Sequence, residues 1–373
     1  MANPVKDWRF VLCDFLGVPI SVLSAVASDK QLDFRLGRPA RCSFTVPSAE
    51  PLVNLSHTDG FPYLSTGRRT VKAYRREGAA WVLRFVGYVW QLGDAGDADT
   101  MRTAVTCFDP MQRLARRIVR DAPGAVTATI LANGGGAAIA KDLVDATNLH
   151  AGATGITTTG GTFATTPTLS YSFEPGTFIG PTIVELCDTD TVDVYFDPID
   201  ATDGLHVRMN AVAQRGTDRP HAKFGYARGN HANAVFQRTE DMEQVANDLT
   251  ILGGPAETRL QKRLTDAASI AAFGVYEDAR AVTLATTQDR IDAIAAGELD
   301  FRVSPVGPLK VVPQPERAPV PWDEYFLGDT VRHYLSADTR EAAVETQRVH
   351  GITVNIDDDG FESVGELLTA ADV

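Results

Sequence analysis

Residues 223–254, KFGYARGNHANAVFQRTEDMEQVANDLTILGG, change from one local pattern to another three times, and the rest of the chain is interpreted around them. Phe224 and Tyr226 have the alternation of a strand end, and Gly229-Asn230 has the composition of a turn. Ala234 to Phe236 then predict a second strand.

The pattern changes to helical spacing at Asp241, because Val245 and Leu249 follow at intervals of four residues. A final apolar strand is predicted from Leu249 to Leu252, and Gly253-Gly254-Pro255 ends it. No residue of this stretch belongs to a catalytic pattern, so the sequence predicts a structural junction here.

Length and composition predict a folded, strand-rich chain of two or three domains. With 373 residues the chain exceeds the usual size of one core, and 44% hydrophobic with 22% charged residues is ordinary globular composition. The 31 glycines and 20 prolines bound short apolar runs, which favours strands and turns over long helices. The first residues lack the pattern of a secretory signal, and no apolar run is long enough to cross a membrane.

The charge of the chain argues against tight binding to phosphate backbones. The formal net charge is −13, whereas nucleic-acid affinity depends on clustered lysines and arginines. A channel through which DNA only passes tolerates such a charge. The basic cluster Arg113, Arg116, Arg117 and Arg120 is interpreted as a solvated helix face, and the separated cysteines Cys13, Cys42, Cys107 and Cys187 as buried small side chains.

The first two segments differ in composition. Residues 1–117 contain six or more short strands, enough to close a small barrel or sandwich. Gly87 lies at a predicted bulge or corner, and a helix from Pro110 to Val119 is predicted to leave this module. Residues 118–211 are predicted to be an inserted α+β domain whose Gly/Thr-rich stretch, residues 151–168, is an exposed loop or a mobile hairpin.

Residues 212–373 are predicted to be a second strand-rich module with short helices. Helical patterns cover residues 264–273 and 289–299, and residues 301–303 return to a strand. The last element is a hairpin around Asp357-Asp358-Asp359-Gly360. The fold class is therefore mainly β: two small barrel-like modules with an α+β insertion between them.

The closing hairpin also contains the spacing of a calcium loop. Asn355, Asp357, Asp359, Ser363 and Glu366 lie at the ligand positions of such a loop. A calcium loop of this kind needs helices on both sides, whereas the flanking residues alternate as strands, so a solvated turn is the favoured interpretation.

Other chemical patterns are weak, and we predict no enzyme, no cofactor, and no catalytic or metal-binding residue. The histidines at 57, 150, 206, 221, 231, 333 and 350 lack ligand spacing and are interpreted as surface or turn residues. The carboxylate pairs Asp188/Asp190 and Asp197/Asp200 lie in polar turns, and Gly134-Gly135-Gly136 lacks the lysine of a phosphate-binding loop. No serine lies in a nucleophile elbow.

Several motifs together resemble the tail-hub or minor tail proteins of tailed bacteriophages. This group includes the siphophage tail-tip hub and is related in fold to the central baseplate hub of contractile tails. The resemblance is clearest over residues 220–370, moderate over the first 115 residues and poor in the middle. Its motifs are YARGNHANAV (226–235), NDLTILGG (247–254), TDAASIAAFGV (265–275), FLGDTV (326–331), RVHGITVNIDDDG (348–360) and FVGYV (85–89).

The resemblance implies a structural virion protein at the distal end of the tail. Three copies form a ring around the DNA exit channel, and the inserted domains lie outside. The implied partners are the distal tail ring, the tape measure protein and tail-tip or fibre proteins, with DNA only as passing cargo.

Two other functions remain open at this point. A receptor- or carbohydrate-binding tail-tip protein would contact the host cell surface through the insertion, where Tyr171, Phe173 and Phe178 are available. An enzyme that degrades the cell wall is the less favoured alternative.

Overall fold

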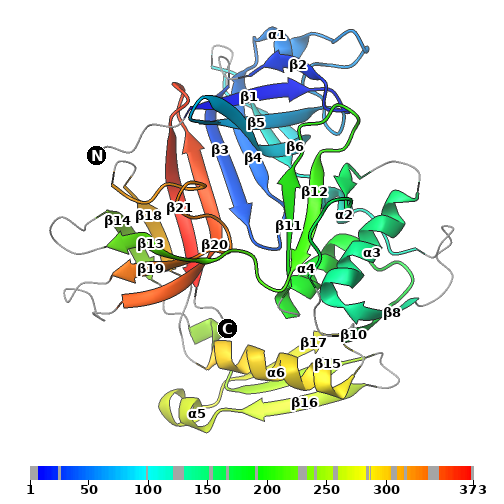
Figure 1. Cartoon of the computed structure of the whole chain (residues 1–373), viewed down its shortest axis with the longest axis vertical. Coiled ribbons are helices and arrows are strands. Elements are labelled where there is room, and N and C mark those ends of the chain that lie inside the picture. Colours follow the sequence, from blue (N-terminus) through cyan, green and yellow to red (C-terminus); the bar gives the residue numbers. More distant parts are fainter. Residues whose placement is uncertain are drawn as a thin grey trace.

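The computed structural model describes most of the chain as strands connected by turns and short helices (Figure 1). The predicted turn at Gly229-Asn230 lies outside the described residues. The described residues are 7–23, 27–97, 100–120, 130–150, 154–164, 168–189, 192–225, 233–238, 242–254, 259–282, 285, 287–303, 309–314, 317–334 and 344–370.

One large sheet joins the beginning and the end of the chain, and this confirms the mainly β fold class. Its strand order is β14-β18-β21-β20-β3-β4-β7-β6-β5-β1-β2, and β19 pairs with both β20 and β13. The N-terminal strands are β1 (Trp8–Cys13), β2 (Pro19–Val22), β3 (Ser28–Arg35), β4 (Arg41–Pro47), β5 (Thr70–Glu77), β6 (Ala80–Ala95) and β7 (Arg102–Phe108), with helix α1 (Pro51–Asn54) between β4 and β5. The later strands are β13 (Asp218–Gly225), β14 (Ala234–Arg238), β18 (Leu309–Pro313), β19 (Thr330–Tyr334), β20 (Val344–Ile356) and β21 (Glu362–Ala370).

Two long strands at the centre of the sheet serve both halves of it. The first part of β20, residues 344–348, pairs with β19, and its second part, residues 351–356, pairs with β3. Strand β21 pairs with β20 along most of its length and with β18 at its end. Figure 1 shows β20 and β21 between β3 on one side and β18 and β14 on the other. The predicted closing hairpin is therefore the shared wall of the fold.

The N-terminal strands curve round until the start of β1 meets the turn between β20 and β21. Asp7 forms an isolated bridge with Phe361, and the Trp8 amide donates to the Gly360 carbonyl at 3.0 Å. Strand β6 turns the corner by changing its partner from β5 to β7 at Tyr88, one residue after Gly87. A side chain at Gly87 would lie 2.7 Å from the Phe108 carbonyl oxygen, so the glycine lets β7 pass close by. The predicted corner is confirmed.

The C-terminal strands curve in the same way around the other part of β20. The path β13-β19-β20-β21-β18-β14 brings its two end strands together, because the Asn233 amide donates to the Gly225 carbonyl at 3.1 Å. The Gly225 amide donates in turn to Asn233 Oδ1 at 2.8 Å. Both barrel-like halves share one hydrophobic core, which includes Phe10, Phe85 and Phe224.

The middle segment folds beside the N-terminal half around a separate core. Figure 1 shows its helices on the outside of the molecule. Its buried residues include Ile139, Ile183 and Met209. Its elements are α2 (Met111–Leu114), β8 (Ile130–Gly135), α3 (Gly136–Asn148), β9 (Ile156–Thr157), β10 (Thr168–Phe173), α4 (Ile179–Thr189), β11 (Asp193–Pro198) and β12 (Val207–Val212).

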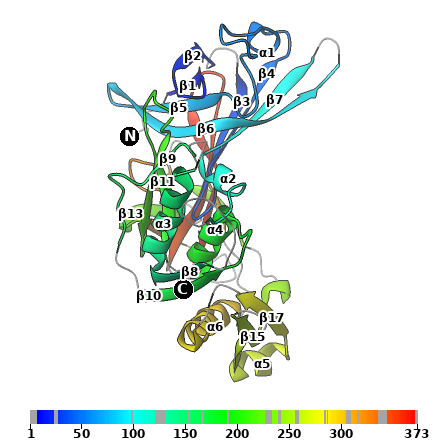
Figure 2. The ribbon, with the colours of Figure 1, turned by 90° about the vertical axis from the view of Figure 1, so that its right-hand side faces the viewer.

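The strand that ends the opening stretch, β15 (Asp248–Gly253), does not join the large sheet. It lies between β16 (Leu260–Thr265) and β17 (Glu277–Val282) in a sheet of three strands, with a third core around Leu249 and Ile291. The strand predicted at residues 249–252 is therefore present, but it lies outside the two barrel-like halves, because a strand pattern does not specify its partners. This unit also holds η1 (Met242–Gln244), α5 (Ala267–Phe273) and α6 (Gln288–Arg302), and Figures 1 and 2 place it at one end of the molecule.

Three predicted element boundaries are wrong for local reasons. The helix after Pro110 ends at Leu114, because Ile118 pairs with Phe178 in an extended bridge. Helix α5 starts only at Ala267, since the Asp266 side chain caps it by accepting from the Ser269 amide. Residues 301–302 belong to α6 rather than to a strand.

Candidate structural junction

A buried arginine closes the N-terminal barrel-like half. Arg75 of β5 is fully buried, and its Nη2 lies 2.6 Å from Glu362 Oε1 of β21. Its Nη1 lies 3.4 Å from an Asp323 oxygen, and its guanidinium faces the Trp322 ring at 5.1 Å. The Trp8 indole donates to the same Glu362 carboxylate at 2.7 Å. This cluster fastens β1 and β5 to β21 where the strands meet.

A buried lysine fastens the middle segment to the same barrel half. The Lys72 ammonium donates to the Gly17 and Ala201 carbonyls at 3.0 and 2.9 Å, and it lies 2.9 Å from Asp200 Oδ1. Its three N–H donors are all used, as a buried ammonium requires. Asp200, which the sequence placed in a solvated turn, is thus part of a contact between two segments.

A ring cluster lies next to this lysine. The His206 ring is fully buried, and its Nε2 donates to the Phe15 carbonyl at 3.0 Å. It packs edge-on against Tyr88 with ring centroids 5.1 Å apart. The Arg113 guanidinium lies over the Tyr88 ring, 3.4 Å from its centroid. Burial lowers the pKa of His206 to about 4, and the charges of Lys72 and Arg113 act in the same direction.

Acidification is therefore expected to destabilise the contact between the middle segment and the N-terminal barrel-like half. The unfolded chain protonates this histidine near pH 6.5, whereas the folded chain resists protonation down to about pH 4, so stability falls as the pH drops through this window. The loss from His206 is at most about 3 kcal/mol. Thermal unfolding of wild type and His206→Gln at pH 7 and pH 4.5 tests this, because glutamine keeps a donor for Phe15 and does not titrate.

The variant is expected to lose less thermal stability on acidification than the wild type. His221 is exposed, so His221→Gln serves as the matched control and should leave the acid loss unchanged. Equal acid losses in wild type and His206→Gln would contradict the assignment.

The chain returns from the middle segment to the large sheet through a tight crossing. Gly216 and Gly328 both have positive φ, and a side chain on either would overlap the backbone of the other segment. Asp329 holds the crossing, because its Oδ1 accepts from the Thr217 amide at 2.8 Å and its Oδ2 from the Phe326 amide at 3.0 Å. The chain thus returns to the large sheet just before β13.

An ion pair across the same crossing joins β20 to β11. Arg348 pairs with Asp193, and its Nη2 also donates to the Arg215 carbonyl at 3.1 Å. The shared strand β20 is therefore attached to the barrel halves by pairing and to the middle segment by this charge pair.

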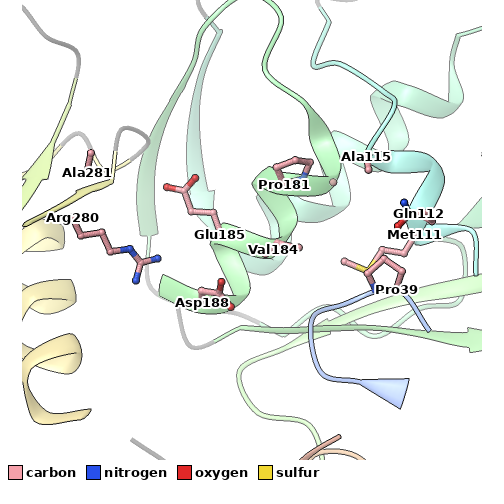
Figure 3. A pocket seen from close by; sticks show the side chains of 11 residues that line it. Pro39, Met111, Gln112, Ala115, Pro181, Val184, Glu185, Asp188, Arg280 and Ala281 are labelled. Atoms are coloured by element: carbon pink, nitrogen blue, oxygen red, sulfur yellow. The ribbon is translucent and has the colours of Figure 1, made fainter. Parts of the chain in front are cut away.

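A pocket of about 510 Å³ lies between the middle segment and the α5–α6 unit (Figure 3). Met111 and Val184 form part of its apolar wall. Figure 3 shows the Arg280 side chain extending from β17 toward Glu185 and Asp188 of α4. Burial raises the pKa of Glu185, and the Arg280 charge opposes this shift.

The residues with calcium-loop spacing lie in a β-hairpin. Asn355 and Ser363 are opposite each other on β20 and β21, and the Asn355 side chain accepts from Gln31 at 3.0 Å. Asp357 Oδ1 accepts from the Phe361 amide at 2.8 Å, and Glu366 pairs with arginine and lysine side chains of neighbouring strands. Within the described ranges, no group of three or more His, Cys, Asp or Glu side chains is placed to hold a metal ion.

Two histidines contradict the prediction that all seven lie at the surface or in turns. His206 and His333 are fully buried. His333 stacks on Phe224 with ring centroids 5.6 Å apart, and burial lowers its pKa to about 4. Spacing in the sequence does not report such ring contacts. His231 lies outside the described residues.

The structure also tests the predictions for the cysteines, the arginine cluster and the carboxylate pairs. Cys13, Cys42 and Cys107 are buried, and Cys187 is half-buried; none of the four is in a disulfide. The arginine cluster is not a helix face, because α2 ends at Leu114 and Arg113 packs on Tyr88. Asp188 pairs with Arg38 at 3.1 Å, and Asp197 accepts from Asn210 at 2.9 Å; Asp190 lies outside the described residues.

Of the aromatic residues proposed for carbohydrate contact, one is buried and one is exposed, and the side chain of Tyr171 lies outside the described ones. Phe173 is buried in the core of the middle segment, whereas Phe178 is 47% exposed. In the part of the chain that the structure describes, no helix is long and apolar enough to span a membrane.

The sequence interpretation missed the buried arginine and lysine side chains that fasten the N-terminal half to β21 and to the middle segment. One signal was available, because Arg75 is in phase with Val71 and Ala73, two buried residues of the same strand. Glu362 lies 287 residues after Arg75, and Asp200 lies 128 residues after Lys72, so these two pairings had no local signal.

Comparisons with known proteins define the fold. No family model matches the sequence, and no curated protein does. A 43 kDa tail protein of prophage MuSo2 from Shewanella oneidensis is similar with a TM-score of 0.59 at 12% identity, and 98% of each chain is covered. A tail protein from Neisseria meningitidis MC58 gives a TM-score of 0.57 at 9% identity, covering 98% of this chain and 96% of that one.

A component of the Escherichia coli type VI secretion system, itself described as similar to T4 bacteriophage tail proteins, is also similar. Its TM-score is 0.50 at 10% identity, with 93% of this chain and 74% of that chain covered. The chain therefore has the fold of phage tail proteins and of related hub-like proteins, as the motif resemblance predicted.

Proposed function

We propose that the chain is a structural protein of a phage tail, a hub ring that joins the tail tube to the tip and surrounds the DNA exit channel. The observation that carries the proposal is the match over 98% of the chain to two tail proteins, one of them from a prophage, with almost the whole of each tail protein covered. A fold shared over the full length favours a shared role, and the assembly contacts tested below decide it.

The architecture supports a ring of three copies. Each chain has two barrel-like halves that share β20 and β21, so three chains present six similar surfaces. Six such surfaces match a tail tube of six-fold symmetry, and the middle segments would lie on the outside. The net charge of −13 suits a wall past which DNA slides, because like charges keep phosphates from adhering.

The proposed place is the distal end of the tail in the virion. The expected partners are the distal tail ring, the tape measure protein and the tail-tip or fibre proteins. A structural role of this kind requires no catalytic group. The buried charge pairs described above would serve in it to hold strands and segments in position.

Purified protein is expected to form a ring of three copies. Light scattering during size-exclusion chromatography measures the mass, and electron microscopy of negatively stained particles shows the symmetry. Some hub proteins assemble only when their partners are present. Both measurements are therefore made over a concentration series and repeated in the presence of a distal tail ring protein. Rings of six under both conditions, or monomers under both, would contradict the proposal.

Incubation with host envelope and with peptidoglycan separates this role from the alternatives. A hub neither binds envelope tightly nor releases soluble fragments. Tight binding that depends on the exposed Phe178 would favour a receptor-binding protein, and released fragments would identify a lytic enzyme.

A further inference from the structure

We propose that a small cavity beside Arg215 binds an oxyanion, either a carboxylate or a phosphate. The cavity has a volume of about 120 Å³ and lies where β3 and β6 of the N-terminal half face β11 of the middle segment. Figure 1 shows β11 next to β3 and β4. Arg35, Arg38, Arg84 and Arg215 all line it, and Trp322 and Phe326 form part of its apolar wall.

Arg215 differs from the other lining arginines because no described residue accepts a hydrogen bond from its guanidinium. The group lies over the Tyr195 ring, 4.1 Å from the centroid, with Phe326 at 5.5 Å. Among the described residues, the hydrogen bonds of Arg215 involve only its backbone, whose amide donates to Asp193 and whose carbonyl accepts from Arg348. Burial lowers the pKa of Arg215, and the charges of Asp197 and Asp193 oppose this effect from a distance. Stacked faces leave the N–H edges of a guanidinium free to donate.

The other charges of the cavity are already satisfied. Arg35 pairs with Asp33 and Glu366, Arg38 pairs with Asp188, and Arg84 pairs with Glu77. Among the lining carboxylates, Asp109 accepts from the Ala40 and Met111 amides, and Asp197 accepts from Asn210. One partly desolvated positive charge therefore remains without a counter-charge in contact, and an oxyanion supplies what it lacks.

The size of the cavity restricts the class of ligand. Pockets for nucleotides or drug-sized molecules enclose about 300–1,000 Å³, so this one is too small for them. It has room for a single small group such as acetate, phosphate or the end of an acidic side chain. The two sources of this chemistry are a free anion and an acidic residue of a neighbouring tail protein.

Thermal unfolding of the full chain in added anions tests the proposal. The probes are sodium phosphate, sodium acetate and N-acetylglutamate amide, each compared with sodium chloride at equal ionic strength. At saturating concentration an oxyanion is expected to raise the Tm by roughly 2–4 °C. Arg215→Gln is expected to remove this rise, whereas the control Arg76→Gln, at an exposed arginine, should retain it.

A second measurement requires no substitution. Crystals of the wild-type protein soaked in sodium selenate are expected to show the selenium anomalous signal within hydrogen-bonding distance of the Arg215 guanidinium. Selenate at other arginines only, or a Tm rise that Arg215→Gln retains in full, would overturn the proposal. If N-acetylglutamate amide raises the Tm more than phosphate does, the source is a protein carboxylate, and the reverse order identifies a free anion.

Discussion

Arg75→Met is expected to lower the free energy of unfolding by about 3–5 kcal/mol. The substitution leaves the nearly buried Glu362 carboxylate without its main counter-charge, and the pair with Asp323 is lost as well. The cost comes mainly from the uncompensated negative charge, because methionine fills a similar volume. Urea denaturation followed by tryptophan fluorescence measures it, since Trp8 and Trp322 both contact the cluster.

The adjacent residue provides a matched control. Arg76 is on the same strand and pairs with Asp7 at 3.1 Å, but its side chain is 53% exposed. Arg76→Met is therefore expected to cost less than about 1 kcal/mol. The double variant Arg75→Met/Glu362→Leu should recover part of the lost stability, because it removes both buried charges. Equal losses for Arg75→Met and Arg76→Met would refute the role of the buried cluster.

Gly328→Ala is expected to lower the free energy of unfolding by about 2–5 kcal/mol, the sum of two effects. The residue has a φ of 85°, which costs an alanine about 1–2 kcal/mol. The new methyl group would also overlap the Arg215 carbonyl, whose carbon lies 2.8 Å from the Cβ position. Relieving this overlap separates the two crossing segments, so the contact of the middle segment with β20 should weaken as well.

A second glycine separates the two effects. Gly176 has nearly the same φ, 87°, and no atom lies within 4 Å of its Cβ position. Gly176→Ala should therefore show only the cost of the backbone conformation. If both alanine variants lose the same stability in thermal and urea unfolding, the crossing is not tightly packed.

The elements that could be predicted from sequence are those that depend on neighbouring residues. The hairpin of β20 and β21 follows from its alternation and from the Asp-Gly turn, and α6 follows from its apolar spacing. The corner after Gly87 was also predicted, since a glycine inside an apolar strand marks a close approach.

What could not be predicted depends on contacts across the chain. The β15 strand has an ordinary apolar pattern, and nothing in that pattern shows that it pairs with β16 and β17 rather than with the large sheet. His206 is buried because Phe15 and Tyr88, more than 100 residues away, surround it. The stacking of Arg215 on Tyr195 and Phe326 likewise requires the crossing at Gly216.

The sharing of β20 and β21 also sets an order of events during synthesis. Strand β3 pairs with β20 across more than 300 residues, and β1 reaches Phe361. Because a ribosome adds about 5–20 residues per second, the N-terminal strands wait many seconds for the strands that complete their barrel. Until residues 344–370 emerge, both halves keep unpaired strand edges, which are sites of mispairing. Neither half closes ahead of the other, so partly made chains do not present a finished assembly surface.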